Sequence, residues 1–525
     1  MPDTYDHITL MCRLKAAQRR NKELESGERY IQLEELHQKE YNVYEHKIEK
    51  LKKELADAHK ETIRALNAEK QKRKPLDMLH GSIWNKLPLF ALPVAATAIL
   101  EQLFNASDVA VVGNFTGTGK TIAVAAVGAN SSIISLIVNL FVGIALGANV
   151  VIANAIGRKD KDAVTKAVHT SIIIAILAGM SVSIAGELVA NPLLASLQMP
   201  EDVFPEALLY LRIYLIGMPV ILLYNFEAAI FRSTGDTKTP LVILTISGIL
   251  NVLLNLFFVA VLHMTVNGVA IATVVSNAVS SILLFYRLVK TKELIHVEWK
   301  ELRIDRKILG QIMRIGLPAG IQSAVFAVAN IVIQSAINSL GTVVMAASSA
   351  AYNIEIFAYD ILNSFSQACT TFVGQNYGAG QIKRCRKVLI LCIVEDAIAT
   401  ACAIVLILLT GKALLSIFNN DPEVISVGYT RLIMVFSAYT FSMLYENMSG
   451  YMRGFGFSLI PAIVTTLGIC GVRIFWIMAV FPSHKTFAGI LTAYPVSLSV
   501  TALLIFLVLV IYHPSKRFQT DKGEM

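Results

Sequence analysis

Arg232-Ser233-Thr234-Gly235 returns later in the chain as Arg453-Gly454-Phe455-Gly456. Gly157 and Gly378 precede the two turns by equal intervals, so the second copy follows the first in register at an offset of 221 residues. Both copies lie among long apolar stretches. Two homologous halves in an apolar chain are typical of transporters, because a site between the halves can open to either side when one half rocks against the other.

The composition indicates an integral membrane protein. Of the 525 residues, 55% are hydrophobic and only 16% are charged, whereas soluble domains have about 25% charged residues. The charges concentrate in residues 11–75, and apolar runs long enough to span a bilayer fill residues 88–512. The net charge of +8 is explained by basic cytoplasmic loops, so we expect membrane lipids as neighbours and no nucleic acid partner.

Patterns typical of enzymes are missing from the sequence. There is no HExxH, no GxSxG, no CxxC pair and no His cluster in the apolar segments. The six Cys fall mostly in or beside apolar helices, where they serve as small apolar side chains. We therefore expect neither an enzyme nor a bound cofactor.

Twelve apolar spans are predicted, six in each half. They cover residues 88–112, 126–150, 165–190, 206–231, 239–262, 267–288, 309–335, 342–374, 386–410, 424–450, 458–481 and 488–512. The predicted fold is an all-α membrane protein with two pseudo-symmetric six-helix bundles and a polar N-terminal helix. Its predicted parts are an extension (1–80), a first lobe (81–290), a linker (291–308), a second lobe (309–513) and a tail (514–525).

Lys and Arg are distributed unevenly between the connections on the two sides. With the N-terminus inside, the inside connections and tail hold 21 of them and the outside connections hold 3. Cytoplasmic loops are enriched in Lys and Arg, so we expect both termini on the cytoplasmic side of the plasma (inner) membrane. Because each half has an even number of spans, the halves are predicted to be parallel repeats about an axis along the membrane normal.

Residues 12–73 lack proline and are rich in Lys and Glu, which predicts one long polar helix. Alternating spacings of three and four residues define a short apolar seam from Tyr41 to Ala65. This seam predicts a coiled coil that self-associates or binds a partner. A solvated helix or a disordered arm explains the same composition, and both alternatives stay open.

Two stretches of sequence resemble a known family. They are Phe104-Asn105-Ala106-Ser107-Asp108-Val109-Ala110-Val111-Val112-Gly113 and Val373-Gly374-Gln375-Asn376-Tyr377-Gly378-Ala379-Gly380. With the repeated Arg-x-x-Gly turn, residues 88–512 resemble the multidrug and toxic compound extrusion (MATE) family of cation-coupled exporters. The resemblance implies a V-shaped pair of six-helix bundles that exchange small organic cations or amphipathic drugs for H⁺ or Na⁺.

Asp108 is the leading candidate for the cation-coupling residue. Glu101, Asn105 and Asp108 lie on nearly one face of the first span, because seven residues make two helical turns. A carboxylate in lipid is costly and therefore indicates a function. Binding of a proton or Na⁺ changes its charge and can bias a conformational equilibrium. The resemblance further implies that the first-span Asp is the coupling carboxylate.

Asn251, Asn255 and Thr273 are predicted to complete this site from spans five and six. The resemblance implies Asn followed by Asp in span five, but the second position here is Asn255. One negative charge fewer weakens the case for Na⁺ beside Asp108 and leaves H⁺ or Na⁺ open. Interhelical hydrogen bonding alone is the competing explanation for the Asn pair.

The second half departs further from the family pattern. Phe326 and Ser442 stand where a coupling Glu and Asp are found in one branch, so we place the main cation site in the first half. Several polar or aromatic residues of spans eight and ten are candidates for lining a substrate cavity: Glu355, Asp360, Gln375, Tyr445 and Glu446.

The sequence favours secondary active efflux of amphipathic, cationic drugs or toxins by alternating access. One alternative is a lipid-linked oligosaccharide flippase of related architecture, which would need several cationic residues in its cavity. The embedded charges here are mainly acidic. Another alternative is a membrane scaffold or receptor that acts through its N-terminal coiled coil.

Overall fold

The computed structural model describes residues 9–16, 33–43, 45–46, 49–50, 53, 75–116, 120–196, 200–483, 485–512 and 514–515. The chain divides into two units, Met1–Lys74 and Pro75–Met525. Residues 75–80, assigned from the sequence to the extension, therefore belong with the helical unit. In the first unit the described residues are helical, and Tyr41 is exposed. The other positions of the predicted seam, from Tyr44 to Ala65, are not among the described residues.

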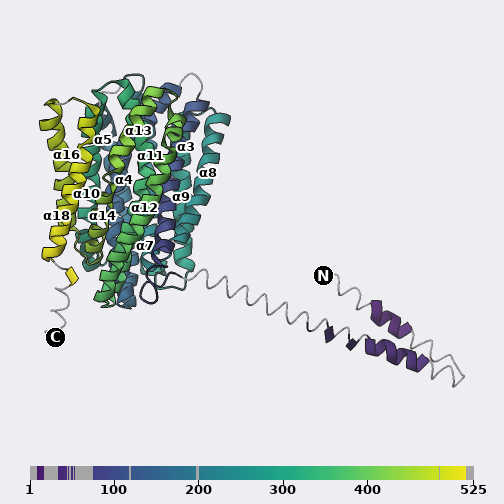
Figure 1. Cartoon of the computed structure of the whole chain (residues 1–525). Helices are drawn as coiled ribbons and strands as arrows, with labels where there is room; N and C mark the ends of the chain where they lie inside the picture. The colour runs from purple at the N-terminus through teal and green to yellow at the C-terminus, as the bar shows by residue number, and fades with distance from the viewer. Residues whose placement is uncertain are drawn as a thin grey trace. The chain divides into compact units, whose positions relative to one another are not determined.

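The described part of the second unit is helical and contains no strand (Figure 1). The first half of this unit contains α3 (Leu87–Phe115), α4 (Lys120–Gly157), α5 (Lys161–Ser196), α6 (Phe204–Ile216), α7 (Met218–Thr234), α8 (Lys238–Leu256) and α9 (Val266–Lys290). The second half contains α10 (Arg306–Asn338), α11 (Thr342–Gly378), α12 (Ile382–Phe418), α13 (Pro422–Phe436), α14 (Tyr439–Gly454), α15 (Leu459–Thr465), α16 (Val472–Phe475), α17 (Phe487–Leu491) and α18 (Ala493–Tyr512). Short π-helical segments continue α8 and join α15 to α16.

Helices coincide with all the predicted spans, but fewer than twelve qualify by length and apolar character. Among the described residues nine helices are long and apolar enough to cross a membrane, and two bent pairs raise the number to eleven. The helix α11 is not among them, since it contains polar residues such as Glu355, Asp360 and Gln375. The bundle is thus an integral membrane fold, and twelve crossings remain a prediction.

The fourth and tenth predicted spans are bent and not straight. The pair α6 and α7 bends by 51° at Gly217, two residues before Pro219, and α13 and α14 bend by 45° near Ser437. Proline cannot donate a backbone hydrogen bond, which weakens the helix at the first bend. At the second, the Ser437 hydroxyl donates to the Met434 carbonyl, a local bond that competes with the helical pattern.

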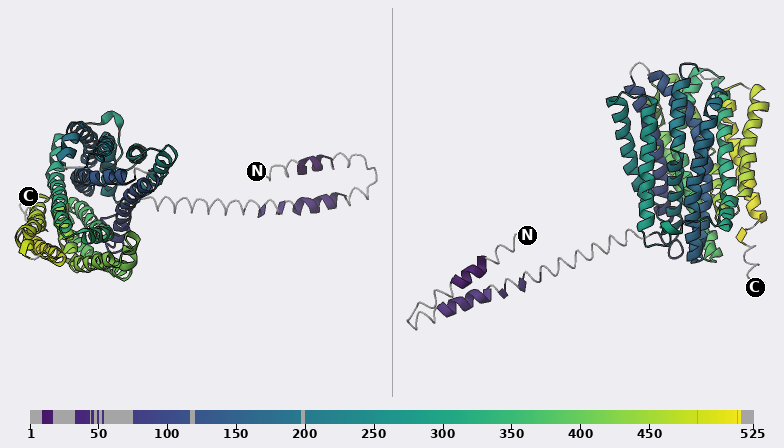
Figure 2. Two further views of the ribbon diagram at one scale, coloured as in Figure 1. Left: turned by 90° about the horizontal axis from the view of Figure 1, so that it is seen from above. Right: turned by 180° about the vertical axis from the view of Figure 1, so that it is seen from behind.

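The helices of each half gather together, with the first half on one side and the second on the other when the bundle is seen from above (Figure 2). We call the end at which α3 begins and α18 ends the Pro75 end. The ends of α4 and α11 and the starts of α5, α10 and α12 lie at this same end, since the chain reverses direction at each connection.

The two halves share an apolar core only toward the Pro75 end. There, Ile308, Ile312 and Ile315 of α10 pack with first-half residues of α4, α5 and α7. Similarly, Met78 and Phe90 pack with second-half residues of α11 and α12. Toward the opposite end each half has a core of its own, one around α6 and α9 and the other around α11 and α13. The halves are therefore joined at the Pro75 end and are separate at the other.

Glycines allow the backbones of the two halves to touch near the shared core. Gly143 and Gly147 of α4 face Gly316 and Gly320 of α10, and a Cβ atom added at Gly320 would overlap the carbonyl of Leu140. Both pairs have four-residue spacing, which places small residues on one face of each helix and permits close packing in membranes. At these glycines the two helices pack backbone against backbone.

Candidate functional site

Asp108 forms a buried polar cluster with three residues from other helices of the first half. Its Oδ1 accepts a hydrogen bond from Asn255 Nδ2 at 2.6 Å, and its Oδ2 lies 3.1 Å from Thr273 Oγ1. Asn255 Nδ2 also donates to Asn251 Oδ1 at 3.1 Å, and Asn251 Nδ2 lies 3.4 Å from Thr273 Oγ1. All four side chains are buried, so α3, α8 and α9 meet at one carboxyl group.

The cluster around Asp108 contains neutral partners only. Among the described residues no Lys, Arg or His forms an ion pair with Asp108, and Asn255 Oδ1 is buried without a hydrogen-bond donor. The Thr273 hydroxyl has a single proton, for which Asp108 and the Val269 carbonyl compete. A buried carboxyl group without a counter-charge is costly when ionised, so this arrangement favours uptake of a proton or a cation.

Glu101 and Asn105 do not join the cluster. Both lie on α3 before Asp108 at positions with high solvent-accessible area, and the hydrogen bonds of the described cluster involve neither side chain. They share a helical face with Asp108, but the Asp108 carboxylate contacts Asn255 of α8 and Thr273 of α9. They remain candidates for attracting a cation toward Asp108.

Glu355 is already paired. Its Oε2 lies 3.0 Å from Arg431 Nη2 on α13, and Arg431 also donates to Ser348 Oγ at 2.7 Å. The pair is buried, with Tyr494 beside the guanidinium group. This geometry gives Glu355 a structural partner, so it does not stand as an unpaired acceptor for a cationic substrate.

The other second-half candidates have different surroundings. Asp360 is buried and its Oδ2 has no hydrogen-bond partner. Glu446 Oε1 lies 3.4 Å from Tyr359 Oη and its Oε2 lies 3.9 Å from Arg453 Nη1. Tyr445 is 1% exposed within an apolar core. Of these side chains, only Asp360 offers an unpartnered carboxyl oxygen.

Gln375 links the two halves. Its Nε2 donates to the Ser233 carbonyl at 2.7 Å, so α11 is tied to the end of α7. One helical turn earlier, Thr371 Oγ1 donates to Asn149 Oδ1 at 3.0 Å, and Asn149 Nδ2 donates to the Ala229 carbonyl. These bonds lie beside the shared apolar core, and they strengthen the closed contact at the Pro75 end.

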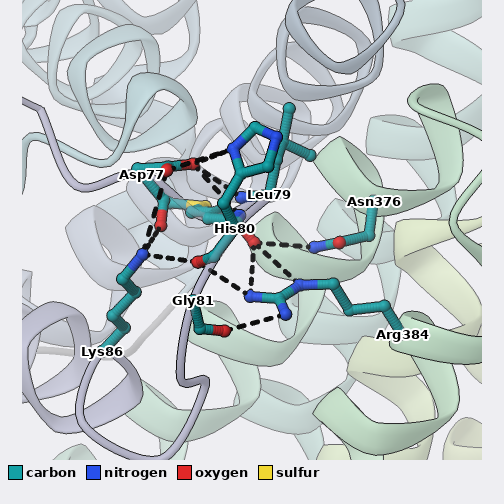
Figure 3. Close-up of polar contacts among 8 residues, drawn as sticks. Asp77, Leu79, His80, Gly81, Lys86, Asn376 and Arg384 are labelled. Carbon is teal, nitrogen blue, oxygen red and sulfur yellow. Dashed lines mark hydrogen bonds and ion pairs between the residues drawn. The ribbon is translucent and has the colours of Figure 1, made fainter.

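The segment Pro75–Lys86 leads into α3 and is held by the second half (Figure 3). Arg384 of α12 donates to three carbonyls, those of Met78, His80 and Gly81, at 2.9–3.4 Å. Asn376 of α11 donates to the Met78 carbonyl at 3.2 Å. The first-half helix α3 is therefore anchored to the opposite half at its start.

Internal bonds shape the same segment. Lys86 Nζ donates to the carbonyls of Asp77 and His80, and the Asp77 carboxylate accepts from the Leu79 backbone N–H at 3.0 Å. Partial burial would raise the pKa of Asp77, but the Leu79 hydrogen bond and the charge of Lys86 lower it below its usual range. On the first-half side, Gly235 has φ +96° and a Cβ there would crowd Leu76.

The MatE family model matches the chain twice, at residues 93–257 and 318–478, which is one match in each half. The chain belongs to the MATE family. A solved structure described as the outward-facing conformation of a multidrug resistance MATE family transporter of the MOP superfamily aligns with a TM-score of 0.76 at 21% identity, covering 84% of this chain and 99% of the other.

Curated relatives of this MATE chain include a probable multidrug resistance protein, YoeA, of Bacillus subtilis. It is 26% identical over 435 residues, or 81% of this chain and 93% of the relative. The probable multidrug resistance protein NorM of Thermotoga maritima is 25% identical over 402 residues, covering 75% of this chain and 84% of the relative. The resemblance inferred from the sequence motifs is confirmed, and the protein is an integral membrane protein of a transporter family.

Proposed function

We propose that this MATE protein exports amphipathic, cationic small molecules in exchange for protons by alternating access. The observation that supports this function best is Asp108, a buried carboxyl group with neutral hydrogen-bond partners and no counter-charge among the described residues. Taking up a proton removes the unfavourable buried charge and changes how strongly Asn255 and Thr273 are held. A group whose charge differs between two states can bias their populations.

The ligand chemistry favours a proton over Na⁺ at this site. Sodium needs several oxygen ligands, as hard cations do in general. Here Asp108 is approached by the Asn255 N–H group and by the Thr273 hydroxyl, both able to donate. The Asn251 oxygen is occupied by Asn255 Nδ2, which leaves Asn255 Oδ1 as the free amide oxygen. A Na⁺ ion would require the amide groups to turn.

The joined end of the bundle is proposed to face the cytoplasm, in keeping with the basic residues of its connections. The state described here would then be closed inside and open outside. For exchange, the proton-loaded and the drug-loaded carriers must both reorient. The backbone contact of Gly143 with Gly320 joins the halves, so this contact would have to separate in such a motion.

An unpaired acid on α11 of the second half supports the proposed substrate class. Asp360 supplies an unpartnered carboxyl oxygen on α11, suited to a cationic group. The flippase alternative is less well supported, since two of the buried guanidinium groups are engaged. Arg431 is paired with Glu355, and Arg473 donates to Ser497 Oγ and stacks on Tyr494.

The proposal is tested by efflux of a fluorescent organic cation from vesicles containing purified protein. A proton gradient alone should drive efflux, and a sodium gradient alone should not. Asp108→Asn should reduce efflux to the level of protein-free vesicles while leaving expression and melting temperature near wild type. The matched control is Asp202→Asn, because Asp202 is exposed and lies in the connection between α5 and α6. Wild-type efflux in Asp108→Asn would refute the assigned role.

A further inference from the structure

A second buried carboxyl group has surroundings that match those of Asp108. Asp396 of α12 is fully buried, and its Oδ2 accepts a hydrogen bond from Asn447 Nδ2 of α14 at 2.6 Å. Its Oδ1 accepts from Thr400 Oγ1 at 2.8 Å. Both oxygens are therefore held by neutral donors, one amide and one hydroxyl, as in the first half.

The amide partners match as well. Asn447 uses both of its N–H groups, one on Asp396 and one on the Met443 carbonyl at 3.0 Å. Its Oδ1 is buried and lacks any donor, as does Oδ1 of Asn255 in the first-half cluster. Asn447 is itself 0% exposed. A buried amide oxygen without a donor is unusual, and an acid proton in this cluster would supply the missing donor.

The charged neighbours of Asp396 do not neutralise it. Among the described residues it forms no ion pair with Lys, Arg or His. From α14 it is approached by Glu446, of the same sign, and on α12 by Glu395 and Cys392, with Cys369 of α11 beside Cys392.

Other ionisable groups on the helices packed on α12 do not supply a cation to Asp396 either. On α13, Arg431 pairs with Glu355, and Tyr429 donates to the Leu408 carbonyl. On α3, Glu101 interacts with the opposite charge of Arg232 and with the like charge of Asp360. No cation in the described surroundings thus offsets a charge on Asp396.

We propose that Asp396, with Asn447 and Thr400, is a second proton-binding site, located in the second half. The inference rests on the proposed proton-coupled transport and adds one proton per cycle to the one bound at Asp108. The two sites are not repeats of each other: Asp108 lies in the first helix of its half, and Asp396 in the third of the other. An ionised Asp396 would be an uncompensated buried charge, which is strongly destabilising.

The proton on Asp396 can be observed directly by infrared difference spectroscopy of the protein in lipid bilayers during a pH titration. The wild-type spectrum should contain components of the C=O stretch of protonated carboxylic acids from both sites. Asp396→Asn should remove one component and keep the one that Asp108→Asn removes. The double variant should lack both, and the Asp202→Asn control should match wild type.

A spectrum of Asp396→Asn identical to wild type at every pH would overturn the second site. If the Asn variant does not fold, Asp396→Glu serves, because the band should then move in frequency; an unmoved band counts against the site. Proton counts per exported molecule supply a second readout, and Asp396→Asn should lower the count. The infrared result needs no transport, so failure of the proposed efflux and failure of this site are distinguishable.

Discussion

Asn255 and Asp108 are 147 residues apart in the sequence, and their side chains meet at 2.6 Å in the structure. The bond joins α8 to α3 inside the first half. The start of α3, by contrast, is held by Arg384 of the second half. The helix α3 is thus bonded to the rest of the first half through Asp108 and to the second half through the segment that precedes it. Protonation of Asp108 can therefore affect the contact between the two halves.

Replacing Asn255 by Asp should create a site for Na⁺. The change puts a second carboxylate beside Asp108, and two adjacent acids with amide and hydroxyl oxygens suit a hard cation better than one acid does. We expect Na⁺ to raise the melting temperature of Asn255→Asp but not of wild type, with K⁺ as the control salt. An equal rise in the melting temperature of both proteins with Na⁺ would contradict the proton assignment at Asp108. No rise in either protein would contradict the created Na⁺ site.

A methyl group at Gly320 should destabilise the protein. The added Cβ would overlap the backbone of Leu140 on α4, and overpacking of this kind costs about 1–3 kcal/mol. Gly310→Ala is the matched control in the same helix, because nothing lies within 4 Å of its Cβ position. The melting temperature should fall for Gly320→Ala and stay unchanged or rise for Gly310→Ala. Equal melting temperatures would mean that the halves do not pack closely here.

Loss of Arg384 should loosen the segment before α3. Its guanidinium group holds the carbonyls of Met78, His80 and Gly81, and charged hydrogen bonds contribute about 1.5–3 kcal/mol each when well shielded, less where exposed as here. Hydrogen exchange in residues 76–86 should therefore become faster in Arg384→Ala, by about tenfold. The exposed Lys383→Ala should exchange as wild type does. Unchanged exchange in Arg384→Ala would show that packing of Met78 and Ile83 holds the segment without it.

Breaking the Arg431–Glu355 pair should destabilise the second half. Removing one member leaves the other as an unpaired buried charge, which costs about 3–5 kcal/mol. Arg431→Met should therefore lower the melting temperature strongly, and adding Glu355→Gln should restore part of the loss. A double variant no more stable than Arg431→Met would indicate that the pair does not interact as described.

Local pattern in the sequence predicted the helices and the family, because apolar length, breakers and the repeated turn are local features. It also grouped Asp108, Asn251, Asn255 and Thr273 into one predicted site through the resemblance, and the structure places these four side chains together. Glu101 and Asn105 share the helical face but take no part in the hydrogen bonds of the cluster, since the face of a helix does not determine which neighbour it meets.

The sequence did not predict which side chains of different helices form pairs. Glu355 and Arg431 are 76 residues apart, and Asp396 and Asn447 are 51 apart. Their contact depends on the rotation and register of packed helices, which a single sequence does not specify. The same holds for residues 75–80. The polar composition of residues 1–80 predicted an extension, whereas the carbonyls of Met78 and His80 accept hydrogen bonds from Asn376 and Arg384 of the bundle.

The most direct test of the central claim is a distance measured between the two halves at the end opposite Pro75. Spin labels at Glu201→Cys and Asn420→Cys, both exposed positions, report this separation after the exposed Cys12 and Cys402 are replaced. We predict that acidification adds a shorter distance population in wild type, and that Asp108→Asn contains both populations at every pH. A single distance that does not respond to pH in wild type, or an unchanged pH response in Asp108→Asn, would contradict control of the two halves by this carboxyl group.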